Sequence, residues 1–202
     1  MAFDFILSAF VTLAVVVDPV GLAPIFIGVT EGLSAAERRS VGWRACGIAG
    51  AILIGAALVG DVLLRRLSIT LPAFQIAGGL LLFWIAADMV YGTRSQREGK
   101  TAEQAVDEHI RNIAAFPLAI PLMAGPGAIA ASVLLAGRAG GWINLSALLA
   151  IIVAICMLTF VVFLFAGRIK HALGITGNVV LSRLLGVILA CLLYTSPSPR
   201  DS

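Results

Sequence analysis

The stretch VVVDPVGLAPIF (residues 15–26) places Pro19, Gly21 and Pro24 inside a run of apolar residues. A proline removes a backbone N–H donor and clashes with the preceding helical turn, so a hydrophobic helix should break here. Asp18 followed by Pro19 has the order expected of a helix cap followed by the first helical residue. We therefore expect one half-helix to end near residue 18 and a second to begin there.

A second stretch, FPLAIPLMAGPGAIA (residues 116–130), has the same character. It holds three prolines and two glycines, which are Pro117, Pro121, Gly125, Pro126 and Gly127. Gly125 followed by Pro126 is a weaker version of the same cap signal. Each break would place unpaired backbone N–H groups and a partial positive charge inside the molecule.

The composition identifies the surroundings of these helices as a lipid bilayer. Of 202 residues, 60% are hydrophobic and 12% are charged, against roughly 25% charged residues in a soluble domain. Several apolar segments reach the ~20 residues that a spanning helix needs. Six segments can be placed, at about Phe3–Val29, Val41–Leu64, Leu71–Tyr91, Ile113–Leu135, Trp142–Ala166 and from near Gly177 onward. The sequence predicts an all-α polytopic membrane protein, and its net charge of +3 lies in loops and implies no nucleic-acid partner.

The segments form two halves, at about residues 3–91 and 113–190, joined by a charged loop at 92–112. The same 107 residues separate Pro19 from Pro126 and Gly79 from Gly186. Because each half has an odd number of spans, the second half should enter the membrane from the opposite side. Inverted repeats are typical of secondary transporters, whereas chance similarity between apolar segments is the alternative.

Basic residues indicate the orientation. The loops after the first, third and fifth segments hold Arg38, Arg39, Arg44, Arg94, Arg97, Lys100, Arg111, Arg168 and Lys170. The opposite side holds Arg65, Arg66 and Arg138. The positive-inside rule therefore predicts that both termini lie outside the cell.

The two breaks differ in chemistry. Asp18 would place a carboxylate at the first, which suits a cation or an ammonium group. The backbone of Gly125, Pro126 and Gly127 has no acid and little bulk, so a carboxylate could approach it closely. Together with Pro19 and Gly21, these residues predict a midplane site for a small zwitterion. Alternatively, the breaks serve packing and Asp18 caps only its own helix.

Other intramembrane polar residues are less informative. Gln75 lies beside small residues and either lines a path or joins helices. Arg183 is either functional or reaches the cytoplasmic surface with its long side chain. The three cysteines form no CxxC pair and predict neither a metal site nor a disulfide. We expect no catalytic residue, metal or cofactor.

At DPVGLAPIF, LPAFQIAGGLLLF, FPLAIPLMAGPGAI and SRLLG, the sequence resembles the MarC family of bacterial and archaeal integral membrane proteins. The resemblance covers residues 2–190 and implies six transmembrane helices in the inner membrane. The family was once tied to multiple antibiotic resistance, and some members look like transporters of small neutral amino acids. Residues 18, 19, 21 and 24 match its first signature and residues 125–127 its second; no catalytic residue comes with it.

The end of the chain departs from this family. Residues 191–202 read CLLYTSPSPRDS, and residues 191–201 can be written in codons that look like the transposase adapter used in sequencing libraries. We expect them to be translated adapter that replaces the native end of the sixth helix, so that residues 1–190 form a single membrane domain. A short external tail is the alternative.

The sequence thus predicts a secondary transporter of small neutral solutes, such as amino acids, that works by alternating access in the bacterial inner membrane. Its partners would be the lipid bilayer and the solute, and assembly as a homo-oligomer is an alternative to a monomer. Na⁺ and H⁺ are the two candidate coupling ions. The alternatives are a channel or exporter, and a membrane scaffold or regulator without transport; an enzyme is not expected.

Overall fold

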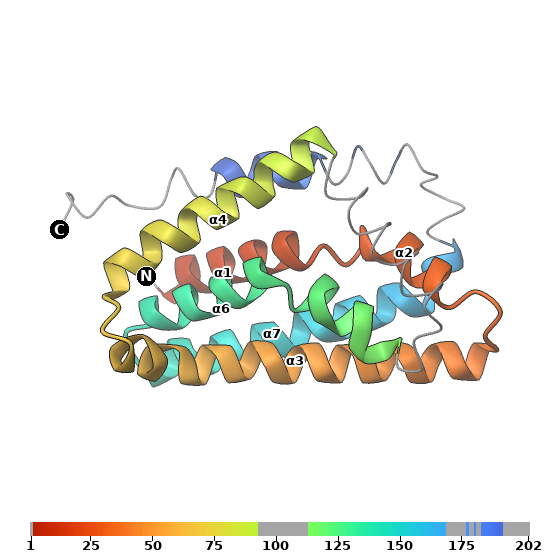
Figure 1. Cartoon of the computed structure of the whole chain (residues 1–202), viewed down its shortest axis with the longest axis horizontal. Helices are drawn as coiled ribbons and strands as arrows, with labels where there is room; N and C mark the ends of the chain where they lie inside the picture. Colours follow the sequence, from red (N-terminus) through yellow and green to blue (C-terminus); the bar gives the residue numbers. More distant parts are fainter. Residues whose placement is uncertain (1, 93–112, 169–176, 178–179, 181–182, 192–202) are drawn as a thin grey trace.

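The computed structural model describes residues 2–92, 113–168, 177, 180 and 183–191, and within them it is helical, with no strand. The elements are α1 (Ala2–Val17), α2 (Leu22–Val29), α3 (Ala35–Arg66), α4 (Leu71–Tyr91), η1 (Ala114–Met123), α6 (Pro126–Arg138) and α7 (Trp142–Leu164). Residues 183–191 add a last helical stretch. The elements run mostly along one common direction, with α4 inclined to the others (Figure 1).

The two expected interruptions are confirmed. The axes of α1 and α2 are bent by 40° across residues 18–21, and those of η1 and α6 by 58° next to Gly125. η1 is itself irregular, because Phe116 and Ile120 have extended backbone angles inside it. Among the described residues, three helices are long and apolar enough to span a membrane, or five if each bent pair crosses as one span. Six spans arranged as an inverted repeat stay a prediction, because much of the sixth segment lies outside the described residues.

The central helix is α3, which packs against η1, α6 and α7. Its buried face consists mainly of small residues, which are Gly42, Ala45, Cys46, Ala49, Gly50, Ala57 and Gly60. A Cβ on Gly60 would lie 2.7 Å from both Cγ atoms of Val133 in α6. Small residues let helix backbones approach closely where lipid provides no hydrophobic drive for association.

α3 begins earlier than its apolar run suggests. The Ser34 hydroxyl accepts a hydrogen bond from the Glu37 N–H, and the Glu37 carboxylate accepts one of 2.8 Å from the Ser34 N–H. This capping box satisfies the first donors of the helix. The helix therefore starts at Ala35, six residues before the expected Val41.

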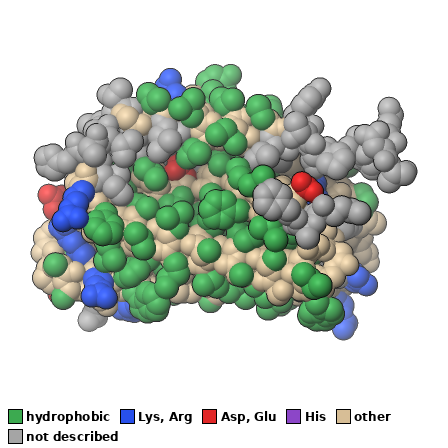
Figure 2. Space-filling view, turned by 180° about the vertical axis from the view of Figure 1, so that it is seen from behind, with side chains coloured by type: hydrophobic (Ala, Val, Ile, Leu, Met, Phe, Trp, Pro, Cys, Tyr) green, Lys and Arg blue, Asp and Glu red, His purple; other side chains and the backbone are tan. Residues whose placement is uncertain are grey.

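The outer surface of the bundle is apolar. Hydrophobic side chains cover most of the middle of the face in Figure 2, and most Lys and Arg side chains lie toward its two ends. Large side chains of α4 and α7, among them Ile76, Phe83 and Val153, are exposed. An apolar exterior of this extent indicates a lipid environment.

α4 joins the last helical stretch to the rest of the bundle. A Cβ on Gly186 would lie 2.8 Å from the Cβ of Met89 and 2.9 Å from the Ala86 carbonyl oxygen. On another part of α4, a Cβ on Gly78 would lie 2.7 Å from Leu134 in α6. Glycines thus set the close approach on both sides of α4.

Candidate functional site

The first break is organised by Asp18, which is 4% exposed. Its carboxylate Oδ1 accepts a hydrogen bond of 3.0 Å from the Gly21 N–H, and its carbonyl oxygen accepts one of 3.1 Å from Leu22. Asp18 has φ of +50°, a left-handed conformation that aspartate and asparagine tolerate better than most residues. The expected N-cap position of Asp18, with Pro19 as the first helical residue, is wrong: α2 begins at Leu22, and its N-cap is Gly21, which has no side-chain cap. The Asp18 carboxylate instead stabilises the turn that precedes α2.

Gly21 completes this turn. A Cβ at this position would lie 2.2 Å from Oδ2 of Asp18, so the carboxylate folds over a residue that has no side chain. Pro19, between them, is buried. The first break is therefore a close-packed turn in which Asp18 and Gly21 depend on each other.

The second break has no side-chain cap at its helix start. Gly125 has an extended backbone (φ −74°, ψ 171°) and Pro126 is the first residue of α6. A Cβ on Gly125 would lie 2.5 Å from the Pro121 carbonyl oxygen. Because Pro126 has no N–H, the first backbone donors of α6 belong to Gly127 and Ala128, which are both buried.

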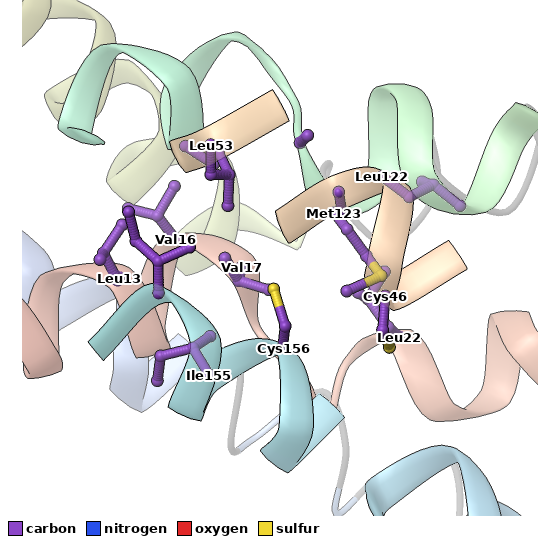
Figure 3. Close-up of a cluster of buried hydrophobic side chains, with 14 of the residues drawn as sticks. Leu13, Val16, Val17, Leu22, Cys46, Leu53, Leu122, Met123, Ile155 and Cys156 are labelled. Carbon is purple, nitrogen blue, oxygen red and sulfur yellow. The ribbon is translucent and has the colours of Figure 1, made fainter. Parts of the chain in front are cut away.

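The structure brings the two breaks together. A Cβ on Gly127 would lie 3.4 Å from Cγ1 of Val16, near the end of α1. One buried cluster contains residues that flank the first break, residues that flank the second, and residues of α3 and α7 (Figure 3). Its labelled members are Leu13, Val16, Val17, Leu22, Cys46, Leu53, Leu122, Met123, Ile155 and Cys156.

α4 covers the start of α6 at this point. A Cβ on Gly127 would lie 2.1 Å from Cδ1 of Ile85, so the tip of Ile85 lies directly against Gly127. Sequence reasoning missed this residue, because one isoleucine in an apolar helix gives no signal. The side chain of Ile85 therefore covers the start of α6 at Gly127.

Asp18 stands apart from the other buried polar residues that the structure describes, which are Thr30, Ser132 and Thr159. Their hydroxyls donate to carbonyl oxygens of their own helices at 2.6–2.8 Å. Such bonds satisfy a hydroxyl at low cost. A buried carboxylate is far more expensive and is usually functional or paired.

The two remaining candidates lie at other levels of α4. Gln75 is half-buried one turn before Gly78 and ten residues before Ile85, about 15 Å along the helix axis. A Cβ on Gly92, the C-cap of α4, would lie 3.4 Å from Nη2 of Arg183. Arg183 thus lies at the end of α4, which favours the interpretation that it reaches the membrane surface.

No group of three or more His, Cys, Asp or Glu side chains that could hold a metal occurs in the described part of the chain. A hollow of about 920 Å³ lies at the end where α3 and α6 finish, and neither break lines it.

A bundle of long apolar helices, two of them interrupted, defines a multi-pass α-helical membrane protein. Comparison with known families agrees with this class. The chain belongs to the MarC family: the family model described as "MarC family integral membrane protein" matches residues 3–194.

The curated relatives are named as membrane proteins too. The chain is 34% identical to the UPF0056 membrane protein YvbG of Bacillus subtilis, over 94% of this chain and 90% of that protein. It is 35% identical to a UPF0056 membrane protein of Archaeoglobus fulgidus, over 94% and 88% of the two chains. It is 32% identical to the UPF0056 membrane protein YhcE of Escherichia coli, over 94% of this chain and 89% of that protein. No solved structure matches the chain significantly. These names state that the relatives are membrane proteins and leave the activity open.

Proposed function

We propose that the chain is a secondary carrier of small neutral solutes, such as amino acids, that works by alternating access. The observation that carries this proposal is the meeting of the two helix breaks. A buried carboxylate, Asp18, lies at one break, and the uncapped start of α6 lies at the other, beside Val16. Paired breaks in corresponding helices are the most direct pointer to a transporter's binding site.

The chemistry of the two breaks suits opposite ends of one solute. The Asp18 carboxylate would attract an ammonium group. The N–H groups of Gly127 and Ala128, with the partial positive charge of a helix start, would attract a carboxylate. A small zwitterion satisfies both, and the small volume around Gly125 and Gly127 leaves little room for a large side chain.

Access to this site requires movement. Ile85 lies against Gly127, and the flanks of both breaks lie in a packed apolar cluster. We therefore assign the structure to a closed conformation. Alternating access would open it by rocking one three-helix half against the other, with the two halves related as an inverted repeat.

The distribution of basic residues also gives the proposed carrier a location and an orientation. The carrier would lie in the inner membrane with both termini outside, as the distribution of basic residues predicts. No cofactor and no catalysed reaction are assigned to it. The choice between Na⁺ and H⁺ as coupling ion is decided by measuring uptake with each gradient.

Counterflow of labelled glycine and alanine into proteoliposomes tests the proposal. Asp18→Asn removes the charge but keeps the hydrogen bond from the Gly21 N–H, because the asparagine side-chain oxygen also accepts such a bond and asparagine also tolerates a positive φ. Asp4→Asn is the matched control, since Asp4 is an exposed carboxylate at the start of the same broken span. We expect saturable counterflow in the unmodified chain and in Asp4→Asn, and loss of it in Asp18→Asn.

Two other outcomes reject the proposal in different ways. Flux that neither saturates nor shows counterflow indicates a channel or exporter. No flux of any tested solute, from folded protein, indicates a scaffold or regulator whose helix breaks serve packing alone.

A further inference from the structure

The hollow at one end of the bundle combines apolar walls with a basic rim. It lies between the C-terminal half of α3, the α3–α4 loop, the turn from α6 to α7 and the start of α7. Its volume is about 920 Å³. The lining residues that carry the inference are Leu58, Val62, Arg65, Thr70, Trp142 and Leu145.

The lining changes character along α3. Ala57, Leu58 and Val62 are apolar, and Arg65 follows at the end of the helix. Arg65 lies eight positions after Ala57, which corresponds to about 12 Å along the helix axis. The other polar side chains of the lining, Ser68 and Thr70, belong to the same loop end. The hollow is thus apolar at one end and polar at the other.

The apolar wall continues onto the lipid-facing surface. Leu58 is 49% exposed and Val62 is 56% exposed. Trp142 is 85% exposed at the start of α7, and tryptophan is enriched where a spanning helix meets the polar headgroups. The hollow therefore opens toward lipid at the level of the headgroup region.

The charge of this end favours an anion. Arg65 and Arg66 are in the last turn of α3 and Arg138 is in the last turn of α6. Asp61 is the acid that the sequence places nearest to them. The start of α1, which carries Asp4, lies at the same end of the bundle (Figure 1). Three arginines therefore face two acids, so that positive charge is in excess at this end.

We propose that this hollow binds one anionic phospholipid. The phosphate lies at Arg65, within reach of the Thr70 hydroxyl, and an acyl chain lies along Leu58 and Val62. A polar solute fits less well, because the lining residues Ala57, Ala136 and Leu145 have no polar side-chain atoms. The inference does not depend on transport, since it rests on a different end of the bundle from the two breaks.

The test is a lipid titration of the purified full chain in detergent, read by native mass spectrometry. Phosphatidylglycerol is compared with phosphatidylcholine of the same acyl chains. Arg65→Gln removes the arginine that lines the hollow, whereas Arg66→Gln removes the same charge from a neighbour that does not line it. We expect Arg65→Gln to weaken phosphatidylglycerol binding about five-fold and Arg66→Gln less than two-fold.

A second pair of variants tests the acyl-chain half. Leu58→Trp would fill the hollow from its wall. Val59→Trp places the same bulk on the next residue, which is also exposed and does not line the hollow. We expect Leu58→Trp to reduce the binding of both lipids and Val59→Trp to leave it unchanged.

Three results would overturn the inference: equal binding of the two lipids, equal effects of the two arginine substitutions, or displacement of the lipid by glycerol phosphate alone. The last would show that the headgroup binds without its chains, as in a water-filled site for a free anion. Circular dichroism of each variant establishes that it is folded, so that a lost complex reports on binding.

Discussion

Replacing Gly127 with alanine tests the contact that closes the second break. The added Cβ would lie 2.1 Å from Cδ1 of Ile85, whereas carbon atoms in contact are about 3.5–4.0 Å apart. The side chain of Ile85 or the helix that carries it must therefore move by more than about 1 Å. Overpacking costs about 1–3 kcal/mol, and the cost here should be near the lower end of this range, because Cδ1 is the far end of a flexible side chain and alanine has a higher helix propensity than glycine.

Shortening Ile85 should relieve this cost. Ile85→Val removes the Cδ1 atom and by itself should cost about 0.5–1.5 kcal/mol. In the double variant the added methyl of residue 127 fills part of the space that Cδ1 leaves. We expect the two substitutions to be coupled by at least about 1 kcal/mol, with the double variant more stable than the sum of the single effects predicts.

The assay is equilibrium unfolding in mixed micelles with increasing SDS, followed by circular dichroism. Gly79→Ala is the control, because a Cβ there would meet no atom within 4 Å. Single effects that add to within about 0.5 kcal/mol would refute the inferred contact between α4 and the start of α6.

Three further predictions concern the scaffold and use the same unfolding assay. Gly60→Ala should destabilise the bundle by about 1–3 kcal/mol, because its Cβ would lie 2.7 Å from a side chain of α6; Gly47→Ala, with no atom within 4 Å, should be neutral or stabilising, and equal effects would contradict the packing of α3. Phe26→Ala should cost about 3–5 kcal/mol, because its ring stacks on that of Phe163 at 4.2 Å between centroids; a cost below about 1 kcal/mol would argue against that stack. Ser34→Ala should cost about 0.5–2 kcal/mol through loss of the capping box, and hydrogen exchange that stays unchanged in the first turn of α3 would oppose this explanation.

The helix breaks were predictable because their cause is local. Proline and glycine act on their own turn, so the interruptions near Pro19 and Pro126 follow from the residues themselves. The bounds of α4 match the predicted apolar segment Leu71–Tyr91, because Thr70 caps the helix and Gly92 ends it at the two ends of that segment.

The start of α3 was placed too late for a physical reason. Hydropathy detects the part of a helix that suits lipid, whereas a helix begins where its first N–H groups are capped. Ser34 and Glu37 cap it in a polar stretch, so the helix extends beyond the apolar segment. The same sequence contained the capping signal, which was readable in principle.

The contacts between distant segments were not predictable from one sequence. The proximity of Gly127 to Val16 and Ile85 joins three helices, and the hollow near Arg65 is formed by residues of α3, α6, α7 and a loop. Apolar helices carry little information on which neighbour each face contacts. Gln75 and Arg183 were named as candidates for their polarity alone, and the structure places both at levels of α4 away from the breaks.

The most direct test of the central claim asks whether one solute occupies both breaks. A single cysteine replaces Ala124, which is buried next to Gly125, in a chain whose own cysteines are changed to alanine. Its rate of maleimide labelling in proteoliposomes is measured with and without glycine or alanine. The account predicts that the solute slows labelling when Asp18 is present and has no effect in the Asp18→Asn background. Labelling that the solute leaves unchanged, in a variant that still shows counterflow, would contradict a shared site at the two breaks.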